Sequence, residues 1–461
     1  MFLKMGDQQD KRNWYIYFAV LSTTLIVVVT GSCFTWTSPI IPKLSSTNHH
    51  VNPIGKPLTL SESAWIVSSM SLGLIFGPSL SMTLSKFFCK KSILLLVGLP
   101  LVLAQIICLF SSTVQYFLIA RFLMGVAAGA VWSVLPNYIA EIAEDSNRGF
   151  LGTLAGVMST GGSLIPYIIG PYVSIKTFTI ISLLPMGLYY ILFGWFVPDS
   201  PYDLILKHQE RKAGQSLMKF RGTTKIEKEL DYISSTIHSS NNDEGFGYLF
   251  RNEGLRRALL ICVILMVFQQ FSGIQAVGSY TQTIFELAGS ELSSEICAMI
   301  VGTVSLISVL ISSRLIDTMG RKILITVSFI VTALSLFSLA VYFYMLSAKM
   351  DVSPVSWLPM IGVIIYMFAF NFGLGILPWV ILGELFPSNV KAVASTITSL
   401  ANFCLSFNVT ACFPYMVEAI GMSGTFFTFG VVMVLGTVFS LIFVPETKGK
   451  SLMEIEKMLK C

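Results

Sequence analysis

Residues 13–42 read NWYIYFAVLSTTLIVVVTGSCFTWTSPIIP and contain no charged side chain. A helix of about 20 apolar residues crosses the hydrocarbon core of a membrane, so this run is long enough for one crossing. It is too long for the apolar region of a cleaved signal peptide, and no small-residue cleavage site stands out. The stretch therefore predicts a first membrane-spanning helix close to the N-terminus.

The same apolar character extends along the whole chain. Of the 461 residues, 54% are hydrophobic and only 12% are charged, whereas average proteins have about 25% charged residues. Runs with few charges begin near residues 14, 63, 92, 115, 149, 177, 258, 296, 323, 355, 392 and 423. Their length fits helices and not the short strands of a barrel. We expect an all-α membrane protein with twelve transmembrane helices, and a soluble cytosolic enzyme is excluded.

One long polar interval divides these runs six and six. It extends from Asp199 to about Arg257, and Ile226, Leu230 and Ile233 recur within it at the spacing of an amphipathic helix. The interval predicts four parts, which are a first six-helix bundle (1–198), a cytoplasmic loop with intracellular helices (199–257), a second six-helix bundle (258–445) and a cytoplasmic tail (446–461).

Basic residues lie mostly on one side of this arrangement. If the N-terminus is inside, all but five of the 30 Lys and Arg residues fall in inner loops and tails. The five exceptions are Lys43, Lys56, Arg121, Lys176 and Lys349. Because Lys and Arg accumulate in cytoplasmic loops, we expect a plasma-membrane protein with both termini in the cytoplasm.

The two halves of the chain also repeat one another. The matched features are a Glu seven residues before a basic residue (Glu141 and Arg148; Glu384 and Lys391), a basic pair that opens an apolar run (Lys90-Lys91; Arg321-Lys322), and a motif that closes each bundle (PDSP at 198–201; PETK at 445–448). Such a parallel repeat places a substrate site between two bundles, near the middle of the membrane.

Acidic residues accompany the basic ones at the predicted inner ends of the helices. The preference of basic residues for the cytoplasm does not explain these acids. Opposite charges that separate when the inner side opens would form a breakable latch. We predict that Glu141, Arg148, Asp317, Arg321, Glu384 and Lys391 form this cytoplasmic gate.

Inside the predicted spans, the conspicuous polar side chains are neutral. There is no His-Glu-x-x-His and no Gly-x-x-x-x-Gly-Lys phosphate loop, so we expect no metal, no cofactor and no enzyme. No carboxylate lies mid-span, which predicts transport without ion coupling. Amides and an indole suit a ligand made of hydroxyl groups, although interhelical hydrogen bonding is the alternative role. The candidates are Gln269, Gln270, Gln275, Asn371, Trp379 and Asn402.

Glycine and proline mark places where helices break or pack closely. Gly373, Gly375 and Pro378 beside Trp379 indicate either a broken helix or a packing kink. Three glycine pairs have the four-residue spacing of close helix contacts. They are Gly73 with Gly77, Gly125 with Gly129, and Gly152 with Gly156.

Eight short motifs are spread along the whole chain. They are RFLMG (121–125), YIAE (138–141) with RG (148–149), PDSP (198–201), QQFSGIQA (269–276), DTMGRK (317–322), GILPW (375–379), ELFP (384–387) and PETKG (445–449). On these motifs, the chain resembles the sugar porter family of the major facilitator superfamily along its whole length. Residues 36–39, Tyr202 and residues 385–391 are similar to the insect trehalose and hexose facilitators. The resemblance implies a monomeric, facilitative transporter of trehalose or a hexose such as glucose, which works in the lipid bilayer by alternating access and binds no nucleic acid.

The resemblance also implies roles for individual residues. Gln269, Gln270, Gln275, Trp379 and Asn402 match the family's sugar ligands. Three other ligand positions differ, since Gly156 stands for Gln, Ser305 for Asn and Asn371 for Glu, and this implies a roomier, less polar site. Lys86 and Cys89 depart from the first-half loop motif, so we expect a weaker N-terminal latch and a population shifted toward inward-open states.

Two other functions stay open at this point. A non-transporting sugar receptor would keep the binding residues in a carrier fold, and its weakened gate motifs favour it slightly. A proton-coupled sugar symporter would need a carboxylate in a span, and the uncharged first span opposes this alternative.

Overall fold

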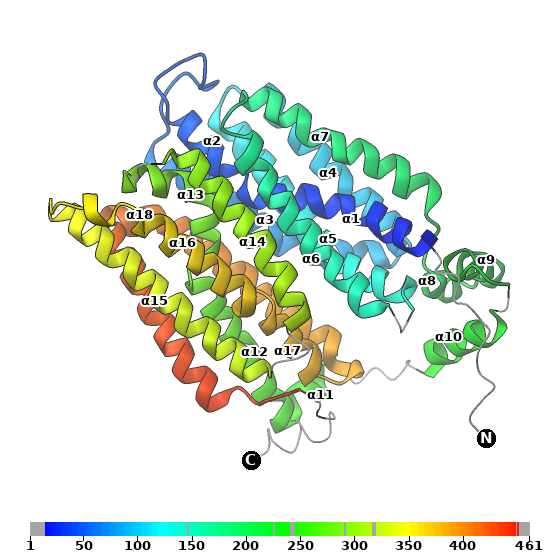
Figure 1. Cartoon of the computed structure of the whole chain (residues 1–461). Helices are drawn as coiled ribbons and strands as arrows, with labels where there is room; N and C mark the ends of the chain where they lie inside the picture. The colour runs from blue at the N-terminus through cyan, green and yellow to red at the C-terminus, as the bar shows by residue number, and fades with distance from the viewer. Residues whose placement is uncertain are drawn as a thin grey trace, which may run out of the picture.

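The computed structural model describes residues 14–144, 147–224, 226–239, 245–289, 292–315, 320–448 and 450, and it is helical throughout this part of the chain (Figure 1). The first half contains α1 (Trp14–Thr35), α2 (Thr37–Leu44), α3 (Leu60–Ser85), α4 (Lys90–Phe110), α5 (Val114–Ile142), α6 (Arg148–Ile169) and α7 (Ile175–Ile191), which continues as a π-helical turn (Leu192–Phe196). The polar interval forms α8 (Pro201–Leu206), α9 (Glu210–Arg221), α10 (Glu227–Ser239) and α11 (Gly245–Arg251).

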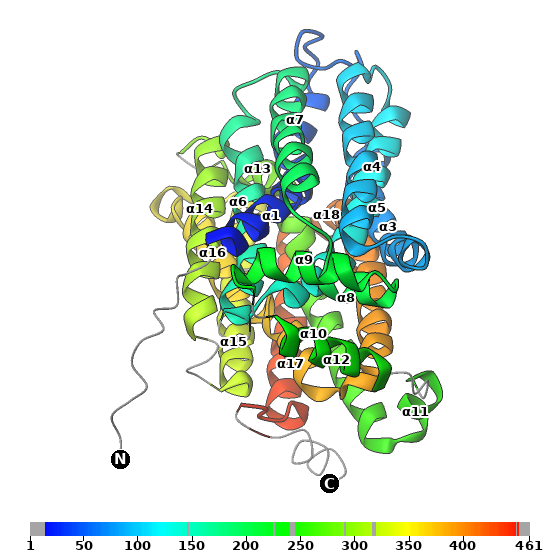
Figure 2. The same cartoon turned by 90° about the vertical axis from the view of Figure 1, so that its right-hand side faces the viewer.

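The second half has the same kind of elements. It contains α12 (Glu253–Phe271), α13 (Ile274–Ala288), α14 (Ser294–Leu315), α15 (Arg321–Ser347), a 3-10 turn (Ser353–Val355), α16 (Leu358–Ala369), a π-helical turn (Phe370–Leu374), α17 (Leu377–Leu385) and α18 (Ser388–Phe443). In Figures 1 and 2 the long helices run alongside one another, and α8, α9 and α10 gather at one end of the molecule. We call that end the inner end, after the predicted topology, and the opposite end, where α2 packs against α13, the outer end.

The number of membrane crossings agrees with the predicted twelve. Ten helical stretches of the described chain are long and apolar enough to cross a membrane. One of them contains α18, whose 56 residues would extend about 84 Å if straight, and its backbone turns at Gly421 (φ 72°, ψ 170°). This stretch therefore supplies two crossings. The twelfth is α6, whose many Gly, Ser and Thr residues lower its hydropathy.

Glycines bring α3 and α5 into direct backbone contact. A Cβ added to Gly73 would lie 2.2 Å from Phe122 O, and one added to Gly125 would lie 2.0 Å from Met70 O. Only hydrogen atoms fit between these helices, as the spacing predicts. The same prediction is wrong for Gly152 and Gly156, because a Cβ at either position would meet nothing within 4 Å.

Three spans are broken part of the way along. The first breaks at Trp36, between α1 and α2, and the seventh breaks between α12 and α13. At the second break Gly273 has φ 84°, and a Cβ there would lie 2.5 Å from Phe429 Cε2, so both conformation and space require glycine. The third break, in the tenth span, confirms that Gly373, Gly375 and Pro378 interrupt a helix.

Candidate functional site

Three of the predicted amides meet in one cluster between α12 and α18. Gln270 Nε2 donates to Asn402 Oδ1 (3.0 Å), and Asn402 Nδ2 donates to Gln269 Oε1 (2.8 Å). Their side chains are only 3–4% exposed. The last turn of α12 and the part of α18 before its turn at Gly421 thus place an oriented chain of amides inside the second half, which we call the amide cluster.

The broken tenth span completes this cluster. A break leaves backbone carbonyls without their helical partners, and here Gln269 Nε2 donates to Leu374 O (2.7 Å) and Gly375 O (3.2 Å). Ser328 Oγ of α15 accepts from the N–H of the same Leu374 (3.0 Å). Gln269 therefore uses its amide to stabilise the interrupted helix.

Gln270 has one unused acceptor. Its Oε1 is buried and has no hydrogen-bond partner in the structure. A buried, unpaired acceptor is costly, and a hydroxyl group of a ligand would remove this cost. Within the amide cluster, Gln270 is therefore the residue best placed to bind a polyhydroxyl ligand.

The other predicted ligands are not joined to the cluster. Asn371 Nδ2 donates to Met367 O (2.9 Å) and Ser305 Oγ to Val301 O (2.9 Å), both within their own spans. Gln275 is partly buried, and its side chain makes no hydrogen bond within the described part of the chain. The ring of Trp379 is 36% exposed. The structure thus does not bring these four side chains into the amide cluster.

The face of α6 that carries Gly156 and Tyr167 lies toward the second half of the chain. Gly156 precedes Tyr167 by 11 residues, or about three helical turns, so the two share one face. Tyr167 Oη donates to Gly278 O of α13 (2.8 Å), which shows that this face meets the broken seventh span. A Cβ added to Gly156 would meet nothing within 4 Å, and the roomier site stays a prediction.

At the inner end of the first half, three helices meet in a charge network. Lys90 Nζ lies 2.9 Å from Glu141 Oε1 and 2.5 Å from Asp203 Oδ1. Asp203 Oδ2 also accepts from Lys90 N–H (2.6 Å), which caps the start of α4, and Ser200 Oγ donates to Glu141 Oε2 (2.6 Å). Sequence analysis missed Asp203 because α8 must fold back before its carboxylate reaches α4.

The second half repeats this network. Arg321 Nη2 lies 3.0 Å from Glu384 Oε1, and Thr447 Oγ1 donates to Glu384 Oε2. Glu446 accepts from the N–H groups of Arg321 (2.9 Å) and Lys322 (3.2 Å) and caps the start of α15. Burial acts to raise the pKa of Glu446, but hydrogen bonds from Lys448, Arg321 and Lys322 outweigh burial and hold it below its usual value.

The remaining latch candidates behave alike in the two halves. Arg148 Nη2 donates to Ala140 O, and Lys391 Nζ donates to Gly383 O, each at 2.9 Å and each eight residues back. Asp317 lies outside the described residues. The ion pairs of Glu141 and Glu384 described above stay within their own halves, so in this structure they do not bridge the two bundles.

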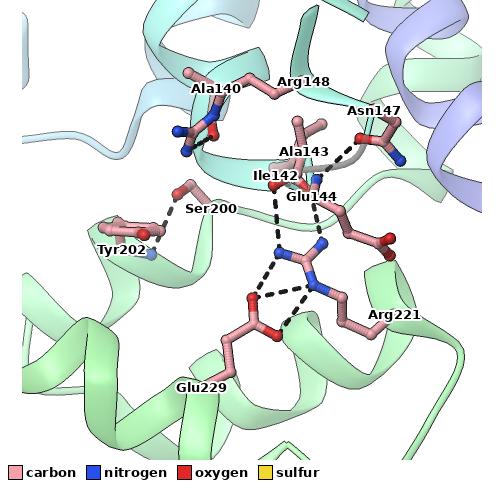
Figure 3. Close-up of polar contacts among 10 residues, drawn as sticks. All are labelled: Ala140, Ile142, Ala143, Glu144, Asn147, Arg148, Ser200, Tyr202, Arg221 and Glu229. Atoms are coloured by element: carbon pink, nitrogen blue, oxygen red, sulfur yellow. Dashed lines mark hydrogen bonds and ion pairs between the residues drawn. The ribbon is translucent and has the colours of Figure 1, made fainter. Parts of the chain in front are cut away.

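Arg221 joins the intracellular helices to the end of α5 (Figure 3). Its Nη1 donates to Ile142 O (2.8 Å), and its Nη2 lies 2.7 Å from Glu229 Oε1 of α10. A cavity of about 350 Å³ lies beside these residues. Its lining includes Glu141, Glu144, Arg148, Tyr202 and Tyr232. Sequence analysis expected helices here but could not identify Arg221 as the residue that attaches them.

Arg121 is the buried cation of the first bundle. It is 1% exposed, and it donates to Cys33 O (2.6 Å) and Ile66 O (3.3 Å) while lying over the Trp36 ring. No carboxylate of the described residues pairs with it. The residue thus lies inside the bundle and not in an outer loop, where the charge count placed it.

The chain matches a known protein family over almost its whole length. The profile of the family described as "Sugar (and other) transporter" matches residues 18–459. The chain is 32% identical to the facilitated trehalose transporter Tret1 of Polypedilum vanderplanki over 96% of this chain and 88% of that protein, and 31% identical to Tret1 of Bombyx mori over 87% and 80%. It spans only 56% of the length of Tret1 of Anopheles gambiae, at 30% identity over 97% of this chain.

Solved structures show the same fold. The xylose transporter XylE of E. coli in an inward-open conformation superposes with a TM-score of 0.80, at 24% identity, over 96% of this chain and 99% of that one. A partially occluded inward-open form gives 0.79 at 23% identity, over 95% and 100%. The similarity extends over both bundles.

Proposed function

Because the chain belongs to the sugar transporter family of the major facilitator superfamily, we propose that it carries trehalose or a hexose such as glucose across the plasma membrane, downhill and by alternating access. Members of this family are transporters and not enzymes, so the chain is a transporter. The choice of sugar rests on the names of the relatives, which are facilitated trehalose transporters. The names of these relatives support neither the receptor nor the symporter alternative.

The choice of site rests on one observation. Within the amide cluster, Oε1 of Gln270 is buried and has no hydrogen-bond partner among the described residues. Asn402 orients the Gln270 amide by accepting from its Nε2, so the free oxygen is already fixed in direction. A sugar hydroxyl that donates to it would gain a hydrogen bond without disturbing the cluster. Trp379, Gln275, Asn371 and Ser305 complete the proposed site.

The surroundings of Arg121 support uncoupled transport. Ion-coupled carriers use intramembrane carboxylates that gain and lose a proton or pair with a buried base. Here the buried guanidinium is held by the backbone carbonyls of Cys33 and Ile66, which do not titrate. We infer that the proton gradient does not drive this carrier.

We propose the same division of the chain that the sequence predicts. Residues 1–198 and 258–445 move as two bundles, residues 199–257 form cytoplasmic helices, and residues 446–461 form a cytoplasmic tail. Both termini lie in the cytoplasm, and one chain in the bilayer is the working unit. The charges of Glu141, Arg148, Asp317, Arg321, Glu384 and Lys391 would then form the inner latch when the inner ends approach one another.

Uptake into sealed vesicles tests the proposal. Purified protein in proteoliposomes should equilibrate radiolabelled trehalose or glucose without accumulating it, and a protonophore should leave the rate unchanged. Gln270→Ala and Asn402→Ala should each lower uptake about ten-fold, since each removes a buried hydrogen-bond partner. Asn408→Ala is the matched control, because this exposed amide donates only to Cys404 O of its own helix. If Gln270→Ala and Asn402→Ala take up sugar as fast as the Asn408→Ala control, the site is assigned wrongly.

A further inference from the structure

Arg121 uses only part of its hydrogen-bonding capacity. A guanidinium group has five N–H donors. The Nε of Arg121 donates to Ile66 O (3.3 Å) and its Nη1 to Cys33 O (2.6 Å), whereas its Nη2 makes no hydrogen bond within the described part of the chain. Three N–H donors are therefore left unpaired on a side chain that is only 1% exposed.

Another unpaired donor lies beside the guanidinium. The Cζ of Arg121 is 5.6 Å from the centroid of the Trp36 ring, and Trp36 is likewise 1% exposed. Its Nε1 is buried and has no hydrogen-bond partner among the described residues, and an indole N–H can only donate. Donors from α5 and from the break between α1 and α2 thus lie close together, and all of them lack an acceptor.

The positive charge of Arg121 also has no negative partner among the described residues. Cys33 O and Ile66 O supply only carbonyl dipoles, and residues 13–42, which form the first span, carry no charged side chain. A buried ion without a partner of opposite charge is costly. Water can accept from the unpaired N–H groups but leaves the charge uncompensated, whereas a small anion supplies both the acceptor and the charge.

Gln105 lies on the side of α4 that is turned toward Arg121. It precedes Cys108 by three residues and so shares its helix face, and Cys108 lies near enough to Arg121 to interact with its charge. Gln105 is 2% exposed, and its Oε1 is buried without a hydrogen-bond partner in the described residues. If the amide turns by half a rotation, its two Nε2 donors face the same space.

We propose that Arg121, Trp36 and Gln105 form a binding site for a small inorganic anion such as chloride inside the first bundle. The anion accepts hydrogen bonds from the unpaired N–H groups and neutralises the guanidinium. Arg121 lies seven residues from the start of α5, about 10 Å along the helix, so the anion enters from the outer end. Because Arg121 also binds carbonyls of α1 and α3, the bound anion stabilises the contact of three spans. The site goes beyond the proposed function and needs no sugar.

The Tm of the purified protein, measured without sugar, tests this site. Potassium chloride replaces potassium gluconate at constant ionic strength, since gluconate is too large for a buried site. We expect the Tm to rise by several degrees and to follow a saturation curve that gives a Kd for chloride. Equal Tm values in the two salts at every concentration would overturn the proposal, because the unpaired donors would then meet water only.

Trp36→Phe locates the anion within the protein. The variant keeps an aromatic ring over the guanidinium and removes only the indole N–H, so the Kd for chloride should rise about ten-fold, as the loss of one charge-assisted hydrogen bond predicts. Thr332→Val is the matched control, because Thr332 Oγ1 is also buried and unpaired but lies on α15 in the second half. It should keep the wild-type Kd. If both variants keep the wild-type Kd, chloride binds elsewhere and the proposal is overturned.

Gln105→Glu replaces the anion with a carboxylate of the protein itself. The new carboxylate should pair with Arg121 and compete with chloride for its N–H groups, so the Tm should become independent of chloride and equal in gluconate to that of the wild type in chloride. Gln115→Glu is the control for added charge, since Gln115 is exposed on α5, and it should keep the full response to chloride. A full response in Gln105→Glu would contradict the proposed position of the anion.

Discussion

Gln269 and Gln270 are adjacent in sequence, but their amides bind different partners. Gln269 Nε2 is occupied by the carbonyls of Leu374 and Gly375, and its Oε1 by Asn402. Gln270 keeps a free acceptor. One residue therefore maintains the broken tenth span, and the other is free to meet a ligand.

Gln269→Ala should consequently lower stability as well as transport. It takes the side-chain donor from the carbonyls of Leu374 and Gly375 and leaves Asn402 Nδ2 only the weak thioether acceptor of Met266, at a cost of about 1–3 kcal/mol for each group left unpaired. We expect a decrease of several degrees in the Tm of purified protein, measured by a thiol-reactive dye. Gln270→Ala should change the Tm much less, because it leaves only one buried group unpaired, the Asn402 Oδ1. Equal Tm losses in the two variants would contradict this division.

The open position on α6 gives a test of substrate size. Gly156→Gln adds an amide at a position where an added Cβ would meet nothing within 4 Å, so we expect the protein to fold. The filled space should disfavour a disaccharide, and we expect the ratio of trehalose to glucose uptake to fall about ten-fold.

Gly161→Gln is the control for this substitution. Gly161 also faces open space, but five residues place it about 140° around the helix from Gly156. Its uptake ratio should stay at the wild-type value. An unchanged ratio in Gly156→Gln itself would show that this face of α6 does not line the path of the sugar.

Part of the site could be predicted from residue type alone. Gln270 and Asn402 were expected because buried amides suit a hydroxyl ligand. Their contact, and the separate role of Gln269, depend on where the tenth span breaks, which a sequence pattern does not locate to one carbonyl. Tyr167 was missed, since a single tyrosine near the end of a span has no distinguishing spacing.

At the scale of elements, Arg221 attaches α9 and α10 to the bundle. It supplies donors to two carbonyls at the end of α5 and pairs with Glu229. Its loss should cost about 2 kcal/mol, the value of charge-assisted hydrogen bonds. Arg221→Ala should therefore increase the rate of chymotrypsin cleavage within residues 199–257 by up to about 30-fold, and gels after limited digestion would measure it.

Arg211→Ala serves as the comparison for this element. Arg211 lies on the same helix, α9, with an exposed side chain that makes no hydrogen bond within the described residues. Its cleavage rate should equal that of the wild type. If Arg221→Ala is cleaved no faster than Arg211→Ala, the intracellular helices are held by other contacts.

Most elements could be predicted because apolar runs report directly on membrane crossings. α6 is too rich in Gly, Ser and Thr to stand out by hydropathy, but its lack of charged residues after Arg148 was enough to predict a span beginning near residue 149. In the polar interval, the spacing of Ile226, Leu230 and Ile233 correctly predicted α10, but α8 and α9 are too short or too polar to show a clear pattern.

For the whole molecule, the described hydrogen bonds between the halves lie in the outer part. Besides those of Ser38 and Tyr167 with α13, Tyr280 Oη donates to Ser63 O (3.4 Å), and the Ser71 and Ser406 hydroxyls lie 3.0 Å apart. The inner ion pairs of Glu141 and Glu384 stay within their halves. The shift of the population toward inward-open states stays a prediction.

Cysteine labelling from the two sides of the membrane checks this state. Gly152→Cys places a thiol on the exposed inner part of α6, where nothing lies within 4 Å. In a background without the exposed Cys404 and Cys412, an impermeant maleimide should react about ten-fold faster in inside-out than in right-side-out vesicles, if the inward-open population dominates. Equal rates from both sides would contradict the assignment.

The glycine contact between α3 and α5 has a mechanical consequence. Where their glycines touch, no side chain can be compressed between the two helices, so they act as one stiff lever. α3 has 26 residues and is therefore about 39 Å long. A tilt of about 10° would displace its far end by about 7 Å, more than the width of a sugar ring. Small rearrangements at one face of the membrane would thus open a passage at the other, provided that the lever does not bend.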